Sequence, residues 1–242
     1  MTSPAFFTRS GGDLLPPGGA VVFDMDGTIL DTEAVIKSVW QRASNHFGYD
    51  LSDDLSLAMV GHRNETCLQM LQGAFGPGFA VDDFWHCCET LFERHVETEG
   101  IPLKPGAREL VAYLHQRGLP MGVATSTDRD KACAHLESVG LLRYFSVLVG
   151  GNEVERPKPA PDIYIEAARR LGVLPALSLA VEDSPVGVRS AHAAGFSVIM
   201  VPDLLSPSKE IEALTIGILP SLHAMLLQLE PVTDGRRREM GG

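Results

Sequence analysis

Two aspartates, Asp24 and Asp26, stand two positions apart directly after a run of apolar residues. The β-prone residues 21–23 that precede them predict a buried strand. Packing does not explain two carboxylates at the end of such a strand, because like charges at close range repel and the pKa of one of them should rise. A bound cation or a shared proton would relieve the repulsion. This stretch therefore predicts a strand end that carries chemistry.

Polar residues also follow two other predicted strands. Thr125 ends the predicted strand at 121–125 and Ser126 follows it, and Glu182 and Asp183 come after the strand at 179–181. Lys158 stands in a segment that three prolines stiffen, at 157, 159 and 161, so that the direction of its side chain is restricted. Since the carboxyl ends of parallel strands form one edge of a sheet, we expect these groups to converge with the two aspartates.

The residue types indicate phosphoryl transfer with Mg²⁺. Four carboxylates without a histidine or thiolate among them form an oxygen-rich site, which suits Mg²⁺ better than zinc. A lysine and a hydroxyl would neutralise and hydrogen-bond the oxygens of a phosphoryl group. Asp24 is suited to attack phosphorus and form an aspartyl-phosphate. Asp26 would then protonate the leaving oxygen and later activate water.

Helices and strands alternate along most of the chain, which predicts an α/β fold with a parallel sheet. The first strand, at 20–24, is separated from the others by a long stretch of helical pattern. The predicted strands after that stretch lie at 121–125, 146–149, 179–181 and 196–201, and the predicted helices lie at 107–117, 128–139, 161–171 and 185–194.

The stretch at 32–103 predicts a helical bundle inserted after the first strand. Asp31 or Thr32 can cap its first helix, Ser52 can cap a short segment, and a third helix runs from 64 to 75. A long helix follows from residue 82, and we interpret the apolar stripe at 84–96, with Cys87, Cys88 and His95, as packing and not as metal ligation.

Composition excludes several classes of partner. The formal charge of −11 would repel nucleic acid and anionic membranes. The four cysteines form no CxxC pair, so we expect reduced thiols and no zinc site. No apolar run is long enough for a membrane span, and residues 1–19 lack the apolar segment of a signal peptide, so we expect a cytoplasmic protein. We expect a flexible leader at 1–19 and a flexible tail at 231–242.

Four motifs in order resemble those of the haloacid dehalogenase superfamily, in its phosphatase branch. They are Asp24-Met25-Asp26-Gly27-Thr28, Val123-Ala124-Thr125-Ser126, Lys158-Pro159 with Pro161-Asp162, and Glu182-Asp183-Ser184. Their spacing and the helical insert resemble sugar-phosphate phosphatases and β-phosphoglucomutase. The resemblance implies a Rossmann-like core, at 20–31 and 104–230, with an α-helical cap domain at 32–103 that closes over the site.

The resemblance also implies a role for each matching residue. Asp24 matches the nucleophile and a metal ligand, and Asp26 matches the general acid/base, whose backbone carbonyl also binds Mg²⁺. Thr125 matches the phosphate-binding hydroxyl, with Ser126 beside it, and Lys158 matches the cation that steadies nucleophile and phosphate. Asp183 matches the remaining metal carboxylate, and Glu182 binds the metal either directly or through water.

Substrate choice should lie in the cap, since the core motifs handle only the phosphoryl group. His62 and Arg63 stand in a polar break between predicted helices that resembles the substrate-specificity loop of the superfamily. The alternative for Arg63 is a helix start that pairs with Glu65 or solvent. We therefore predict a Mg²⁺-dependent phosphatase of a small phosphorylated metabolite, with a sugar phosphate favoured and hexose phosphate, pentose phosphate, phosphoglycolate and nucleoside monophosphate all open.

Other functions are less favoured by the sequence. A dehalogenase would lack the second aspartate, and a phosphonate hydrolase would need a cap lysine, which is absent from 38–103. A phosphomutase like β-phosphoglucomutase uses the same motifs, but the segment after Thr125 lacks that enzyme's asparagine. A metal-binding regulator without turnover is the remaining alternative, and the intact catalytic positions argue against it.

Overall fold

The computed structural model describes residues 17–59, 62 and 64–229. Within them, six parallel strands form one sheet in the order β3-β2-β1-β4-β5-β6. This is the strand order of the Rossmann fold, and it confirms the predicted α/β class. The strands are β1 Val21–Phe23, β2 Met121–Ala124, β3 Val147–Val149, β4 Leu179–Glu182, β5 Ser197–Met200 and β6 Gly217–Ile218.

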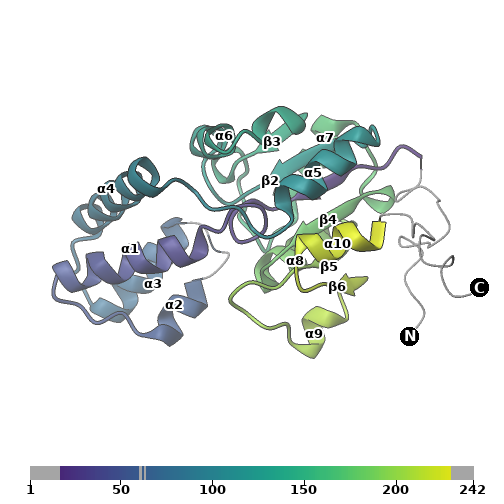
Figure 1. Cartoon of the computed structure of the whole chain (residues 1–242). Coiled ribbons are helices and arrows are strands. Elements are labelled where there is room, and N and C mark those ends of the chain that lie inside the picture. Colours follow the sequence, from purple (N-terminus) through teal and green to yellow (C-terminus); the bar gives the residue numbers. More distant parts are fainter. Residues whose placement is uncertain (1–16, 60–61, 63, 230–242) are drawn as a thin grey trace, which may run out of the picture.

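Helices cover both faces of the sheet (Figure 1). Since side chains alternate along a strand, Val21 and Phe23 of β1 pack on one face with α5, α6 and α10, and Val22 packs on the other face with α7 and α8. The helices outside the insert are α5 Ala107–Gln116, α6 Arg129–Ser138, α7 Asp162–Leu171, α8 Pro185–Ala193, α9 Lys209–Glu212 and α10 Leu222–Leu229. Short 3₁₀ turns occur at Leu142–Tyr144, Gly151–Glu153 and Pro175–Leu177.

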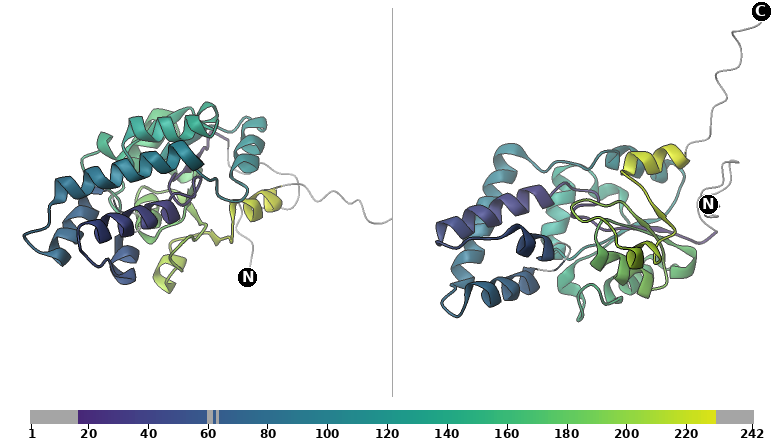
Figure 2. Two further views of the ribbon diagram at one scale, coloured as in Figure 1. Left: turned by 60° about the vertical axis from the view of Figure 1, so that its left-hand side comes forward. Right: turned by 90° about the horizontal axis from the view of Figure 1, so that it is seen from below.

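The predicted helical insert is formed by α1 Glu33–His46, α2 Asp53–Met59, α3 Asn64–Phe75 and α4 Val81–Glu99. These helices lie beside the sheet in each view (Figure 2). They pack around their own apolar cluster, in which Trp40, Leu71 and Phe84 are buried. Cys88 is buried in this cluster and Cys87 packs against it, so both serve packing as expected, and the cysteines are free thiols.

Two chain segments connect the helical insert to the sheet, and they lie side by side. The amide of Asp31 donates to the carbonyl of Pro102 at 2.9 Å, and the amide of Lys104 donates to the carbonyl of Ile29 at 2.9 Å. The Lys104 ammonium group lies 3.4 Å from Asp31 and 2.7 Å from Asp203. Entry to and exit from the insert are therefore held together by backbone and side-chain contacts.

Some expectations differ from the structure or fall outside it. Thr32 precedes α1, but its hydroxyl makes no cap contact; it donates to Asp26. Ser52 does cap α2, accepting a hydrogen bond from the amide of Leu55. The predicted tail at 231–242, most of the predicted leader and Arg63 lie outside the described residues. Among the described helices, none is long and apolar enough to span a membrane.

Candidate active site

The site is built on the central strand of the sheet. β1 pairs with β2 on one side and β4 on the other, and the strand order reverses between β1 and β4, which is where ligands bind in such sheets. The amide of Asp24 still donates to the carbonyl of Val181 at 2.9 Å, so the pairing holds this residue in line with the strand. Gly27 then adopts a φ of 82°, which a side chain would strain, and turns the chain back beside the site.

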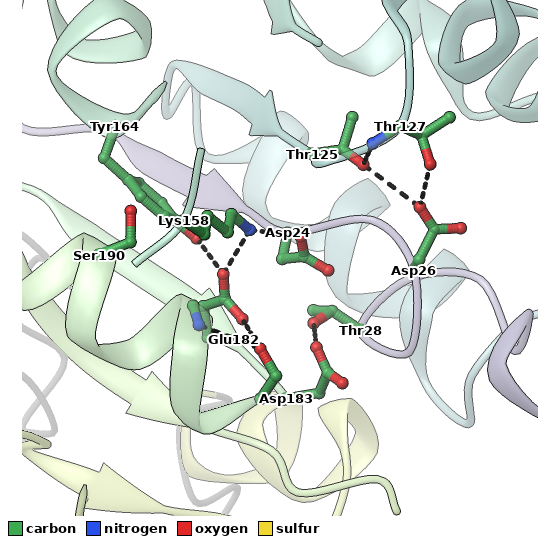
Figure 3. Close-up of polar contacts among 12 residues, drawn as sticks. Asp24, Asp26, Thr28, Thr125, Thr127, Lys158, Tyr164, Glu182, Asp183 and Ser190 are labelled. Atoms are coloured by element: carbon green, nitrogen blue, oxygen red, sulfur yellow. Dashed lines mark hydrogen bonds and ion pairs between the residues drawn. The ribbon is translucent and has the colours of Figure 1, made fainter. Parts of the chain in front are cut away.

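Lys158 joins the first and fourth motifs. Its ammonium group donates to Asp24 Oδ1 and to Glu182 Oε1, each at 2.6 Å (Figure 3). The Lys158 residue is only 4% exposed. The segment that carries it is tied down by Arg156, which forms two hydrogen bonds to the Asp162 carboxylate. Lys158 is thus a buried partner of two carboxylates, which is the convergence expected from its position between prolines.

Burial and charge shift the pKa values of both partners. Burial raises the pKa of Asp24 well above its usual range, and the nearby Glu182 and Asp26 carboxylates add to the rise, while Lys158 opposes it. Burial alone would lower the pKa of Lys158, but the attraction of Asp24 and Glu182 outweighs burial and raises it. The lysine is therefore a permanent positive charge, and Asp24 depends on cations to stay ionised.

Glu182 is held from several sides at the end of β4. Besides Lys158, the hydroxyl of Tyr164 donates to Glu182 Oε1 at 2.7 Å, and the hydroxyl of Ser184 lies 3.4 Å from Oε2. The Tyr164 ring also lies 5.3 Å from the Lys158 ammonium group. Because Tyr164 is fully buried and lies beside Glu182 and Asp24, its pKa is well above the usual range and it remains a donor.

Asp24, Glu182 and Asp183 form a buried group of carboxylates. Oxygen atoms, one from each of them, all lie within 4.8 Å of one another. The hydroxyl of Thr28 donates to Asp183 Oδ1 at 3.0 Å and orients that carboxylate. The Lys158 ammonium group supplies one positive charge against these carboxylates, so the donor set and its net negative charge fit a hard divalent cation.

The Asp26 carboxylate lies apart from this group and contacts hydroxyls (Figure 3). Thr32 donates to Oδ1 at 2.8 Å, while Thr125 and Thr127 donate to Oδ2 at 3.2 and 2.8 Å. The Thr125 hydroxyl in turn accepts from the amide of Thr127 at 3.1 Å. Hydroxyl groups can both donate and accept, so these contacts can hold Asp26 in either protonation state.

One pocket is lined by most of the site residues that were predicted from the sequence. Its lining includes residues from the segments that follow β1, β2 and β4 and that precede α7, and residues from the helical insert. The first group is Asp24, Asp26, Thr125, Ser126, Asp183 and Lys158, and the second is Ile36, His62 and Asn64. Burial lowers the pKa of His62. Glu182 is fully buried behind Lys158. The structure thus brings the four motifs and His62 together, and the predicted role of Arg63 stays a prediction.

Sequence reasoning missed several contributors to the site. Thr127 stands in the same run as Thr125, so its hydroxyl was a readable signal. Thr28 belongs to the first motif, but its place in the sequence does not mark it as the donor to Asp183. Tyr164 follows the proline segment at a position that helical periodicity gives to the core, and its contact with Glu182 has no signature in the sequence.

Comparisons with known proteins agree with this arrangement. A family model described as haloacid dehalogenase-like hydrolase matches residues 21–201. The phosphorylated carbohydrates phosphatase of Thermotoga maritima is 32% identical over 180 residues, which is 74% of this chain and 83% of that protein.

The bifunctional riboflavin kinase/FMN phosphatase of Arabidopsis thaliana is 34% identical over 189 residues, which is 76% of this chain but only 48% of that protein. Among solved structures, CbbY from Rhodobacter sphaeroides in complex with phosphate matches with a TM-score of 0.73 at 26% identity. That match covers 87% of this chain and 98% of the other.

Proposed function

Since this chain belongs to the haloacid dehalogenase-like hydrolase family and is an enzyme that hydrolyses phosphate monoesters, we propose that it is a Mg²⁺-dependent phosphatase that works through an aspartyl-phosphate on Asp24. The observation that carries the proposal is the position of Lys158, 2.6 Å from Asp24 Oδ1, beside the buried carboxylates. The substrate is a small phosphorylated metabolite of sugar type.

We assign Asp24, Asp183, the carbonyl of Asp26 and Glu182 to the metal site. Oε1 of Glu182 accepts short hydrogen bonds from Lys158 and Tyr164, whereas Oε2 has the long 3.4 Å contact with the Ser184 hydroxyl, so we assign Oε2 to the ion or to a water molecule bound to it. When bound, Mg²⁺ supplies positive charge to the phosphoryl oxygens and favours the ionised form of the carboxylates. This added positive charge compensates for the effect of burial, which raises the pKa of Asp24.

Each residue of the site then has its own role in the proposed reaction. Asp24 attacks phosphorus, while Lys158, Thr125 and Ser126 neutralise and hydrogen-bond the phosphoryl oxygens. Asp26 gives a proton to the leaving oxygen and later takes one from the attacking water. The hydroxyls of Thr32 and Thr127 hold the Asp26 carboxyl in place through both steps.

We assign residues 32–103 to a cap over the core formed by 20–31 and 104–230. In support, Ile36, His62 and Asn64 of the helical insert line the same pocket as the catalytic residues of the core. The paired connections at Asp31 and Lys104 are suited to act as hinges. Closure of such a cap excludes water from the phosphoryl group and completes recognition of the leaving group.

The test is release of inorganic phosphate from a panel of phosphate monoesters, with and without Mg²⁺. We expect release that needs Mg²⁺, is abolished by EDTA and is lost in Asp24→Asn. Asp53→Asn, at an exposed position on α2, is the matched control and should keep full activity. Mg²⁺ should also raise the melting temperature of the wild type by preferential binding to the folded state, and Asp183→Asn should lose this shift.

Two results would contradict the proposal. Folded protein that releases no phosphate from any ester would favour a metal-binding regulator. Interconversion of sugar phosphates without release would favour a mutase. The two matched enzymes differ in leaving group, since one is named for phosphorylated carbohydrates and the other for FMN.

A further inference from the structure

A second, larger cavity continues from the phosphate site. It has a volume of about 310 Å³, against about 60 Å³ for the pocket at the phosphate site. The two share Asp26, Ile36, Asn64 and Thr127 in their linings. A volume near 300 Å³ is in the range of pockets that hold small organic molecules. A phosphate bound beside Asp24 would therefore direct its leaving group past Asp26 into this cavity.

The larger cavity lies between the helical insert and the core. Trp40 of α1 and Trp85 and Phe92 of α4 form one side, while Lys131 and His135 of α6 form the other. The Phe92 and His135 rings are in contact, with centroids 5.4 Å apart, and Lys131 forms an ion pair with Glu89. These contacts join α4 to α6 along the lining of the cavity.

Polar and aromatic residues are separated along the cavity. Asp26, Asn64 and Thr127 lie at the end shared with the phosphate site and can hydrogen-bond the hydroxyls of a short sugar or polyol arm. Trp40, Trp85 and Phe92 are not part of the phosphate pocket, so they lie further along. Tryptophan and phenylalanine offer flat apolar surfaces that favour another flat ring.

The charges in the cavity oppose a second anionic group on the substrate. Among the described residues of its lining, the acidic ones are Asp26, Glu89 and Glu93. The Lys131 ammonium group is already engaged by Glu89 and lies 5.5 Å from the Trp85 ring. A leaving group with a carboxylate or a second phosphate would meet these carboxylates without a matching cation, at a cost in binding.

We propose that the substrate of this phosphatase is a monoester whose leaving alcohol carries a flat, uncharged heteroaromatic ring on a short sugar or polyol arm, with Trp85 and Phe92 as the residues that select the ring. Nucleoside 5′-monophosphates and FMN have this chemistry, whereas ribose 5-phosphate has the arm without the ring. The proposal rests on the proposed phosphatase function and narrows its substrate class.

The first test compares kcat/KM for AMP, UMP and FMN with that for ribose 5-phosphate in the presence of Mg²⁺. We expect at least one ring-bearing ester to exceed ribose 5-phosphate by about 10-fold or more, the scale of a stacked base. Trp85→Leu should lower this preference by about 10-fold, mainly through KM. Trp85→Tyr keeps a flat ring and should preserve most of the preference for ring-bearing esters. Equal values for all four esters, or a preference that Trp85→Leu leaves unchanged, would overturn the proposal.

The second test measures binding without turnover. The chain has two tryptophans, Trp40 and Trp85, and both line the cavity, so the tryptophan emission reports on its occupation. In Asp24→Asn, AMP or UMP should quench this emission to saturation, and ribose 5-phosphate should not. Absence of quenching by any ring-bearing ester would overturn the proposal.

The two tests separate this proposal from the phosphatase function. If ribose 5-phosphate and the nucleotides are hydrolysed with equal kcat/KM and no quenching occurs, the ring proposal fails while the phosphatase function stands. If no ester is hydrolysed but AMP quenches the emission to saturation, the phosphatase function fails while the cavity still binds a ring.

Discussion

The ammonium group of Lys158 lies 2.6 Å from Oδ1 of Asp24, although 134 positions separate the two residues in the chain. The same ammonium group lies 2.6 Å from Glu182. One lysine therefore fixes the geometry between Asp24, the proposed nucleophile, and the acidic end of β4. Breaking a buried pair by removing one partner is costly, because the other charge stays buried without compensation.

Lys158→Met should lower kcat by about 10² to 10³-fold, the range found when one group that stabilises transition-state charge is removed. It should also reduce the free energy of unfolding by about 3 kcal/mol. Steady-state phosphate release and urea denaturation measure the two effects. Lys209→Met, at an exposed position, is the control and should change stability by less than about 0.5 kcal/mol. A Lys158→Met enzyme with wild-type kcat would contradict the assigned role.

Tyr164→Phe should reduce the free energy of unfolding by about 1–3 kcal/mol, because it removes a buried donor to a carboxylate and keeps the ring. Activity should fall as well, since Glu182 then holds Lys158 less firmly. Tyr49→Phe is the matched control. The Tyr49 hydroxyl makes only a 3.5 Å exposed contact with the carbonyl of Gly78, so its removal should have little effect. Equal losses in the two variants would show that the Tyr164 hydroxyl has no special part in the site.

Glu166 provides a test of pH dependence away from the site. Hydrogen bonds from Arg169 and Arg170 lower the pKa of Glu166 from 4.5 to about 2. Because the folded-state pKa is depressed, this pairing stabilises the protein above about pH 4.5, and the contribution is lost as the pH falls toward 2. Glu166→Gln should cost at most about 1 kcal/mol at pH 7, since solvent screens an ion pair near the surface.

Urea denaturation of wild type and Glu166→Gln between pH 7 and pH 3 measures this difference. The gap between the two proteins should narrow as the pH falls. A gap that widens toward acid pH would mean that Glu166 is not stabilised as a carboxylate. Added salt should also reduce the gap at pH 7, because these groups are partly exposed.

The sheet and the strand-end residues could be predicted because their signals are local. An apolar run followed by carboxylates marks β1 and Asp24, and the predicted helix at 64–75 is confirmed as α3. β6, with the two residues Gly217–Ile218, is too short to leave a periodic pattern and was not predicted.

Side-chain partners were the part that the sequence could not supply. Thr32 stands where a helix cap is expected, but the fold places the Asp26 carboxylate 2.8 Å from its hydroxyl, and the hydrogen bond to this charged acceptor sets the direction of the side chain. Tyr164 looks like a core residue of α7 until the fold brings Glu182 of β4 against its hydroxyl. Such contacts follow from the packing of distant elements and have no signature along the chain.

The most specific prediction concerns Gly187, in the first turn of α8. A Cβ built at this glycine would lie 2.0 Å from the carboxylate oxygens of Glu182, so an alanine must displace that side chain. Glu182 cannot move without losing its contacts to Lys158 and Tyr164. Gly187→Ala should therefore destabilise the protein by about 1–3 kcal/mol. Activity should fall by about 100-fold, the cost of a misplacement of about 1 Å.

Gly73→Ala is the matched control, since Gly73 also lies in a helix and a Cβ there meets no atom within 4 Å. Helix propensity favours alanine at both positions, by about 0.5–1 kcal/mol, so Gly73→Ala should stabilise the protein and leave its activity intact. The two variants share this propensity gain and differ in the clash with Glu182. If Gly187→Ala also gains stability and keeps wild-type phosphate release, the position of the Glu182 carboxylate does not matter for catalysis, and its assignment as the group that holds Lys158 is wrong.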